Sequence, residues 1–539
     1  MDNHQPSRLS FAYWDTLPEA AVRRAFWIFA TALFGFRLLV LALVPFDLSG
    51  DEACYWAWGR HLAWGYASKP PGIAWLMALA SKVGGDTTFG IRMFAALLGT
   101  GSLICLFQLA LRLYGPAVAM ITGIVFVANP ANAALNLVLT IDAPLMFFWT
   151  LSLWAFWEFT DVSPAGEKVA RPGWGLLLFL SLVGGLLSKQ MMLTFLPLAV
   201  AFLTLSKDRR AQLWRPGTWC VLLGSLVAWL PPLWWNAQHQ WLTLRHTVQH
   251  FESGGAAFGR QVVRCFEHVG AQAGILTPVL YLLLMALVIA GLWSWKKLGD
   301  RERFLWLFGG PALLVILLLS LRQRIQPNWP AVFYTSTSIL LAGWAAGKWS
   351  LALKLDRWRW IFSPGLKIAV GFAVVVHVVV GALSFDLLRL PGLDPTARIR
   401  GWSQLARDVD AVRRDLPGGE EMTLITQSHR YMTSELAFYL HDRPRVYSSN
   451  SDPTSTSSQY DLRETPAAHL GKDALIIIQG DPQSIEAELT NRFESVTVHS
   501  VLRYPGQSTA LQVVTLAMGR KLRIWPGNGA RSDSGIRHE

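Results

Sequence analysis

The chain contains little charge and few cysteines. Only 16% of its 539 residues are Asp, Glu, Lys or Arg, while 52% are hydrophobic, and the mean hydropathy is +0.32. This composition excludes an intrinsically disordered chain and is unusual for a soluble enzyme. The four cysteines show no paired spacing, so the sequence contains neither a disulfide framework nor a zinc-ribbon motif; they are Cys54, Cys105, Cys220 and Cys265.

Long apolar runs fill most of the chain up to residue 390. Many of them approach or exceed the roughly 20 residues that cross a bilayer as a helix. A shorter apolar piece at residues 72–83 indicates an interfacial or re-entrant helix. The sequence therefore predicts a polytopic α-helical membrane protein with about 11–13 transmembrane helices. We place predicted spans at residues 25–45, 88–113, 116–139, 141–160, 174–188, 190–206, 216–235, 274–295, 304–321, 330–348 and 366–388.

The basic residues predict the orientation of these spans. With residues 1–24 in the cytoplasm, nearly every compact basic cluster falls on the cytoplasmic side, as the positive-inside rule requires. The positive-inside rule then explains the formal net charge of +12, so this charge does not indicate binding to nucleic acid. Arg23 and Arg24 precede a first run that is too long for a cleavable signal, so we interpret it as an uncleaved anchor. Eleven spans place the C-terminal part outside.

The composition changes after the last apolar run. Residues 391–400 have the Pro/Gly/Asp pattern of a linker, and residues 394–520 predict a small extracytoplasmic α/β domain. No glycine-rich phosphate loop follows its strands, so a nucleotide site is not expected. Residues 521–539 are predicted to be a disordered basic tail. We expect strands at 422–426, 445–449, 474–479, 495–501 and 510–516, and helices at 431–440 and 482–493.

One polar stretch between the first apolar runs contains most of the candidate chemistry. Residues 45–71 read PFDLSGDEACYWAWGRHLAWGYASKPP, with adjacent carboxylates at Asp51 and Glu52 and a cation at Lys69. The plain interpretation is a solvated loop with an interfacial aromatic belt. The functional interpretation is a general base at the membrane surface near a phosphate-binding cation.

Five motifs follow one another along residues 25–350. They are GDEACYWAWGRHLAWGYASKPPGIAWL, TIDAPLMFFWTLSLW, GGLLSKQMMLTFLP, PPLWWNAQHQWLTLRHTVQH and QPNWPAVFY. These motifs resemble those of bacterial protein-mannosyltransferase-like and aminoarabinose-transferase-like membrane glycosyltransferases of the C-type superfamily. The resemblance implies transfer of a sugar from a polyprenyl phosphate, such as undecaprenyl phosphate, at a periplasmic active site.

The resemblance also implies roles for single residues. Asp51 matches the family's catalytic carboxylate. Lys69 stands where many relatives have His before Pro-Pro, whereas the aminoarabinose-type enzymes have Lys there, in contact with the lipid phosphate. Gln326 replaces the Glu that many relatives carry before Pro-Asn-Trp, so any metal role of that acid is in doubt. We assign no metal ligand and leave a divalent metal ion open as a cofactor.

The reaction class explains the residue types. A sugar phosphate already has a good leaving group, so the acceptor hydroxyl needs a base more than the donor needs an acid. Asp51 is the candidate base. Glu52 could orient Asp51, bind a cation or be solvated. The departing phosphate needs cations, for which the candidates are Lys69, Lys189, Arg322 and Arg324.

Further polar residues on the predicted outer face are candidates for support. Asp142 follows an apolar span and could cap a helix or support the site. The predicted loop at residues 236–273 contains Asn236, His239 and Arg245. His246 and His250 have the i, i+4 spacing of metal ligands but no evident third partner, so ordinary loop residues are the simpler interpretation.

Together these observations predict an inverting glycosyltransferase in the bacterial inner membrane. Its acceptor would be lipid A, the core sugars, another envelope glycan or a protein. A polytopic transporter or lipid flippase is the alternative, but transport usually needs ionisable residues near the bilayer midplane, often in repeated halves. Here the charges gather at the outer face and we find no convincing repeat. A non-catalytic envelope scaffold, the third reading, would tolerate loss of Asp51.

Overall fold

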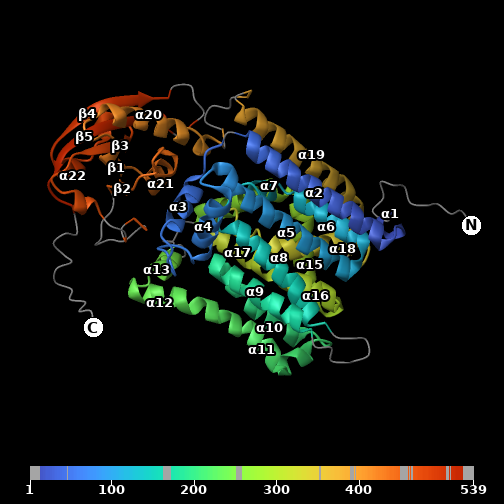
Figure 1. Ribbon diagram of the computed structural model, residues 1–539. Coiled ribbons are helices and arrows are strands. Elements are labelled where there is room, and N and C mark those ends of the chain that lie inside the picture. Colours follow the sequence, from blue (N-terminus) through green and yellow to red (C-terminus); the bar gives the residue numbers. More distant parts are fainter. Residues whose placement is uncertain are drawn as a thin grey trace, which may run out of the picture. The chain divides into compact units, whose positions relative to one another are not determined.

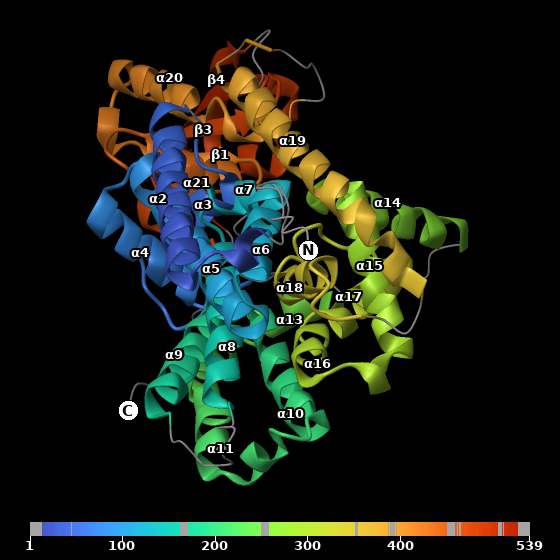
Figure 2. The same cartoon turned by 90° about the vertical axis from the view of Figure 1, so that its right-hand side faces the viewer.

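Figures 1 and 2 show the computed structural model of the chain. Its contacts divide the chain into two compact units. Unit 1 comprises Met1–Leu43, Arg92–Trp235 and Thr247–Val378, and unit 2 comprises Val44–Ile91, Asn236–His246 and Val379–Glu539. The sequence-based domain boundaries did not predict that the first polar loop belongs to the same unit as the C-terminal part. The structure describes residues 13–44, 46–161, 171–249, 258–350, 354–385, 387–388, 394, 396–449, 459–460, 462, 465–504, 509 and 511–525.

The apolar runs form helices, as predicted. Five described helices are long and apolar enough to cross a membrane, and a bent pair, Gly259–Leu276 with Pro278–Trp293, could form a sixth span. Shorter apolar helices accompany them, so the chain is a polytopic helical membrane protein. The helices up to residue 384 are α1 (Tyr13–Thr16), α2 (Glu19–Leu43), α3 (Gly50–Gly59), α4 (Gly72–Gly84), α5 (Thr88–Tyr114), α6 (Pro116–Ala128), α7 (Pro130–Leu135), α8 (Asp142–Phe159), α9 (Pro172–Ser188), η1 (Gln190–Thr194), α10 (Phe195–Leu205), η2 (Arg210–Trp214), α11 (Pro216–Leu222), η3 (Gly224–Trp229), α12 (Leu230–Gln238), α13 (Leu242–Gln249), α14 (Phe258–Leu276), α15 (Pro278–Trp293), η4 (Trp295–Lys297), α16 (Asp300–Leu307), α17 (Gly310–Arg322), α18 (Phe333–Ala345), η5 (Lys354–Trp358) and α19 (Arg359–Ser384).

Two sequence-based expectations for this part need correction. The predicted span 116–139 is interrupted between α6 and α7, because Pro130 starts a new helix and has no N–H to continue the old one. The segment 236–273, expected as a loop, contains α13 and most of α14. α14 is amphipathic, with Val263 and Phe266 exposed on its apolar side, so its hydropathy is too low for a span although its periodicity is helical.

The core of unit 1 is one apolar cluster that extends along the chain from Val22 to Ala369. α8 and α9 run side by side within it in both views (Figures 1 and 2). At its centre Trp149 meets the rings of Phe195 and Phe333 edge to face, with centroids 5.3 and 5.4 Å apart. Such edge-to-face pairs add to the stabilisation that the burial itself provides.

Unit 2 contains a five-stranded mixed sheet with the order β2-β1-β3-β5-β4. The strands are β1 (Thr423–Gln427), β2 (Val446–Ser448), β3 (Ala474–Gln479), β4 (Phe493–Arg503) and β5 (Val513–Leu522), close to the five predicted. β1 pairs in parallel with β2 and β3, while β5 is antiparallel to β3 and β4. β3 reads ALIIIQ and all but its last residue is buried, as expected for a central strand.

Two helices complete the α/β part of unit 2. α20 (Trp402–Asp415) precedes the sheet, and α21 (Arg430–Tyr439) connects β1 to β2 close to the predicted 431–440. The predicted helix 482–493 is wrong, because Ile485 and Glu486 are extended and only the short pieces η9 (Pro482–Ser484) and α22 (Ala487–Thr490) form. The predicted tail, 521–539, begins too early, because Lys521 and Leu522 belong to β5 and residues 521–525 are described; residues 526–539 lie outside the described residues.

The first polar loop is bonded to this α/β part within unit 2. The Asp47 carboxylate accepts hydrogen bonds from the backbone N–H groups of Trp402 and Ser403, at 2.8 and 3.3 Å. It therefore caps the N-terminus of α20 from a position 355 residues earlier in the sequence. Leu48 N–H donates to the Tyr439 hydroxyl on α21 at 2.7 Å. These bonds hold the start of the loop against two helices of the α/β part.

One charged cluster of the α/β part is sensitive to pH. His441 Nδ1 lies 3.2 Å from Asp410 Oδ1, and its Nε2 lies 2.7 Å from Glu420 Oε1. The hydrogen bond with Asp410 is the main reason that the pKa of His441 is raised above 6.5, and Glu420 adds to the effect. Protonated His441 therefore stabilises the fold below its ordinary pKa, and this stabilisation is lost as the pH rises through the raised value.

We predict that His441→Gln loosens the α/β part at pH 6 more than at pH 9. Hydrogen exchange of amides in α20 and α21 of the full chain would measure the loss of protection at both pH values. His499→Gln, a substitution of an exposed histidine on β4, is the control and should leave both values unchanged. Equal losses for His441→Gln at the two pH values would contradict the assignment.

Candidate functional site

The two adjacent carboxylates of the polar stretch have different environments. They lie in the first turn of α3, whose N-cap is Ser49. Glu52 N–H donates to Ser49 Oγ at 3.3 Å, and Ser49 N–H donates to Glu52 Oε2 at 2.9 Å, which forms a capping box. Glu52 is completely buried, whereas Asp51 stays partly exposed. The solvated interpretation of Glu52 is therefore wrong, and Asp51 is the more accessible acid of the two.

The loop that carries Lys69 is held by Tyr66. The Tyr66 ring stacks on Trp58 of α3 with centroids 4.8 Å apart and planes 4° apart. Its hydroxyl lies within hydrogen-bond distance of Ala63 N and His61 O, both at 3.1 Å. Tyr66 N–H donates to the Lys69 carbonyl at 3.3 Å. Lys69 itself is half-buried, and this bond ties its backbone to the stacked Tyr66.

The candidates in the 236–250 segment divide into a turn residue and more exposed side chains. Asn236 is buried, and its side-chain oxygen accepts from Thr243 N–H at 3.0 Å, at the start of α13. Thr243 Oγ in turn donates to the Tyr66 carbonyl at 2.7 Å, which ties this turn to the Lys69 loop. His239 is half-buried and Arg245 is exposed.

Asp142 and Lys189 form a buried ion pair in unit 1. Lys189 Nζ lies 2.7 Å from Asp142 Oδ1, with side chains 11% and 7% exposed. The other oxygen, Oδ2, accepts from Asn328 Nδ2 at 2.7 Å. The helix-cap interpretation of Asp142 is wrong, because Asp142 is the first residue of α8 and the N-cap, Ile141, makes no side-chain cap bond. Lys189 interrupts the helix between α9 and η1 with extended backbone, which leaves its side chain available to Asp142.

The loop that carries Asn328 is supported from α14. Gln272 is completely buried, and its amide donates to the Pro327 carbonyl at 3.1 Å while its oxygen accepts from the Tyr334 hydroxyl at 2.9 Å. Gln326 is exposed at the start of this loop. Sequence reasoning did not single out Gln272 or Asn328, although Asn328 stands within one of the family motifs.

The remaining predicted cations lie at the end of α17. Arg322 and Arg324 are both exposed. Arg264 of α14 donates to the Arg322 carbonyl at 2.9 Å, so a third guanidinium lies against this end of α17. Sequence reasoning missed Arg264, because it stands in a segment that was expected to be a loop.

The described residues give little support for a metal site. His250 lies outside them, so the structure does not test the alternative of a metal at His246 and His250. One group of described residues, Asp410, His441 and Asp442, has ligand atoms close enough for a metal. The Arg413 guanidinium already bonds both of its carboxylates, at 3.0 Å to Asp410 and 2.9 Å to Asp442. A resident cation would compete with that arginine, so we derive no step through a metal.

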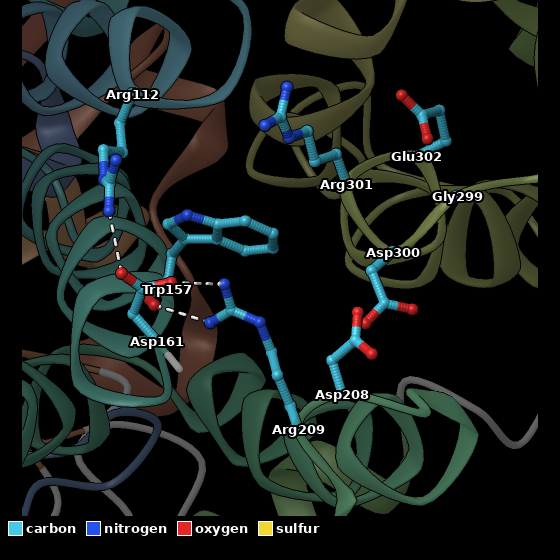
Figure 3. A pocket seen from close by; sticks show the side chains of 9 residues that line it. All are labelled: Arg112, Trp157, Asp161, Asp208, Arg209, Gly299, Asp300, Arg301 and Glu302. Atoms are coloured by element: carbon cyan, nitrogen blue, oxygen red, sulfur yellow. Dashed lines mark hydrogen bonds and ion pairs between the residues drawn. The ribbon is translucent and has the colours of Figure 1, made fainter. Parts of the chain in front are cut away.

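A cavity of about 500 Å³ in unit 1 contains none of the predicted site residues (Figure 3). Asp161 accepts from both Arg112 and Arg209, at 2.7 and 3.2 Å. The Arg209 guanidinium also lies 3.7 Å from the centre of the Trp157 ring. The charged side chains that line the cavity therefore neutralise much of one another's charge, which is typical of a structural ion-pair network. The lining residues are Arg112, Trp157, Asp161, Asp208, Arg209, Gly299, Asp300, Arg301 and Glu302.

The Asp142–Lys189 pair yields a stability prediction. Removing one partner leaves the other charge buried and unpaired, which typically costs about 3–5 kcal/mol. We expect Asp142→Asn and Lys189→Met each to lower the thermal midpoint of the detergent-solubilised protein. The double variant should lose clearly less than the sum of the two, because it leaves no orphaned charge. Lys207→Met, at an exposed lysine of unit 1, is the control, and additive losses would show that the pair is not coupled.

Comparisons with known proteins find similar membrane glycosyltransferases. Residues 68–235 match the family described as dolichyl-phosphate-mannose-protein mannosyltransferase. A lipid A galacturonosyltransferase from Rhizobium johnstonii is 28% identical over 433 residues, which is 77% of this chain and 83% of the relative. An undecaprenyl phosphate-α-4-amino-4-deoxy-L-arabinose arabinosyl transferase from Pseudomonas paraeruginosa is 29% identical over 231 residues, 40% of each chain.

The fold is also similar to a solved structure. The crystal structure of ArnT from Cupriavidus metallidurans bound to undecaprenyl phosphate covers 92% of this chain and 98% of its own, with a TM-score of 0.60 and 16% identity. The apo structure of the same protein gives a TM-score of 0.59. The transporter and scaffold alternatives find no support among these relatives. The chain is therefore a membrane glycosyltransferase, similar in sequence and in fold to the protein-mannosyltransferase-like and aminoarabinose-transferase-like enzymes of the C-type superfamily.

Proposed function

We propose that this enzyme transfers a sugar from undecaprenyl phosphate, or a related polyprenyl phosphate, to lipid A, with inversion at the anomeric carbon. The relatives named above include a transferase whose acceptor is lipid A and another whose donor is an undecaprenyl phosphate sugar. The structural observation that carries the proposal is the accessible Asp51 carboxylate on the capped first turn of α3.

In this mechanism Asp51 acts as the general base. Its carboxylate takes the proton of the acceptor hydroxyl while the oxygen attacks the anomeric carbon from the face opposite the phosphate. The bond from the anomeric carbon to the phosphate oxygen breaks, and the phosphate leaves with the electron pair. The capping box fixes the α3 backbone, so the base is held on a rigid element, as positioned catalysis requires.

Cations stabilise the departing phosphate in the same proposal. Lys69 is the first candidate, because the half-buried lysine is positioned by the Tyr66–Trp58 support. Arg322 and Arg324 are exposed and can meet an anionic lipid headgroup. Lys189 would contribute only if the phosphate shares it with Asp142, to which it is paired. Asn236, His239 and Arg245 are proposed to support the site from the α12–α13 segment.

We further propose that the N-terminus is cytoplasmic and that the C-terminal α/β part is periplasmic. The support is the distribution of compact basic clusters, which falls on one side of the predicted spans. This orientation places Asp51 and Lys69 in the compartment where an acceptor on the outer face of the inner membrane is available.

The base assignment predicts that Asp51→Asn lowers turnover about 10²–10⁴-fold while donor binding survives, because Asn cannot accept the proton. The assay follows sugar transfer from a defined undecaprenyl phosphate sugar to purified lipid A. Glu52→Gln is the matched control. Its amide oxygen can still accept the hydrogen bond from Ser49 N–H, so this variant should keep wild-type turnover. If folded Asp51→Asn retains wild-type turnover, Asp51 is not the base; if Glu52→Gln is inactive instead, the roles are reversed.

For the phosphate site, we predict that Lys69→Ala lowers kcat/KM for the donor roughly ten- to hundredfold. Loss of a charge-assisted contact to a phosphate is worth on the order of 1.5–3 kcal/mol. Lys82→Ala, at an exposed lysine of α4 in the same unit, removes an equal charge and should leave kcat/KM unchanged. Equal effects of the two substitutions would point to general electrostatic attraction rather than a phosphate site.

A further inference from the structure

The α/β part of unit 2 presents one end of its sheet to helix α3. α21 follows β1 after only two residues and leads to the parallel strand β2, so its first turn lies at the carboxyl end of β1. In sheets with parallel strands this edge is where functional groups usually gather. α21 and α3 lie side by side in both views (Figures 1 and 2), and their packing belongs to unit 2. The first residues of α21 therefore meet the first turn of α3.

Tyr431 makes the contact that matters for chemistry. Its hydroxyl donates a hydrogen bond to Asp51 Oδ1 at 3.3 Å. Its ring lies directly on the backbone of Gly50, where an added Cβ would be only 2.2 Å from Tyr431 Cγ. The His429 ring packs against Tyr431 edge to face, with centroids 4.2 Å apart. The hydroxyl is thus aimed at Asp51 by contacts on two sides of the ring.

The backbone beneath Tyr431 is anchored to α3 as well. The Arg430 carbonyl accepts from Ser434 Oγ at 3.2 Å and from Cys54 Sγ at 3.9 Å. Burial raises the pKa of the Cys54 thiol to about 12, so it stays protonated and able to donate. The Arg430 guanidinium carbon lies 5.4 Å from the Tyr431 ring centre, and its charge reaches Asp51. A cation therefore accompanies the hydroxyl at the carboxylate.

We propose that the α/β part completes the active site, with Tyr431 as a positioning residue that holds the Asp51 carboxylate through its hydroxyl. One oxygen, Oδ1, is occupied by the tyrosine, which leaves Oδ2 to receive the proton of the acceptor. This inference rests on the proposed role of Asp51 as the general base and adds a residue from a distant part of the chain.

The test uses the full-length enzyme with undecaprenyl phosphate sugar and lipid A. Tyr431→Phe keeps the ring and removes the hydroxyl, so we expect kcat to fall about tenfold with little change in donor KM. A general loss of structure would instead weaken donor binding as well. Tyr439→Phe is the control on the same helix, since its hydroxyl bonds Leu48 instead of Asp51, and it should leave kcat unchanged.

Two further variants separate positioning from structure. Gly50→Ala should reproduce the kcat loss of Tyr431→Phe, because its methyl group displaces the ring while alanine is compatible with the helix. Tyr431→Phe should cost nothing further in an Asp51→Asn background if Tyr431 acts only through Asp51.

The outcomes distinguish this inference from the proposed function. Wild-type turnover in Asp51→Asn would remove the base itself and the inference with it. Loss of turnover in Asp51→Asn with an unchanged kcat in Tyr431→Phe would overturn the positioning role alone. An additive loss in the double variant would also overturn it, because the tyrosine would then act independently of Asp51.

Discussion

The capping box at the start of α3 determines what the two adjacent acids can do. A helix start leaves backbone N–H groups without partners, and here Ser49 and Glu52 exchange side-chain bonds with each other's backbone. This exchange uses the Glu52 side chain at the helix end, where it is buried. Asp51 is the preceding residue and points about 100° away around the helix axis, so it stays partly exposed. A single local bond pattern thus separates a structural acid from a candidate catalytic one. The positions of Trp58, Tyr66 and Lys69 depend on the same helix, since Tyr66 stacks on its Trp58.

Local signals in the sequence predicted most elements of the fold. Hydropathy located the helices, because burial in lipid or protein selects long apolar runs, and α5 begins and ends within a residue of the predicted 88–113. The β3 strand, Ala474–Gln479, matched in full because a central strand is apolar on both faces. Within the candidate site, motif and topology singled out Asp51 and Lys69. The structure adds the capping box that holds the helix of Asp51 and the Tyr66 contacts that hold the loop of Lys69. α14 was not expected, since an amphipathic helix lacks the hydropathy on which span prediction depends.

Contacts between distant residues could not be predicted in the same way. The sequence around Asp142 suggested a helix cap, because an Asp at the start of a helix commonly bonds the nearby backbone N–H groups. Its partners are instead Lys189 and Asn328, which lie 47 and 186 residues away in the sequence. Asp47, which sequence reasoning ignored, is the residue that caps a helix, and that helix starts at Trp402. Nothing in the periodicity of residues 430–439 indicates that Tyr431 meets Asp51, because periodicity reports which face is buried and not what it is buried against.

The discontinuous make-up of unit 2 has a consequence for biogenesis. The bonds from Asp47 to Trp402 and from Asp51 to Tyr431 join residues that are 355 and 380 positions apart. A ribosome delivers the first polar loop long before the strands and helices that complete its surroundings, so the loop must wait without them while the intervening helices enter the membrane. Contacts of such long sequence separation form late and slowly. Assembly of unit 2 therefore requires the C-terminal residues, and a chain that ends before α21 would present Asp51 without its Tyr431 partner.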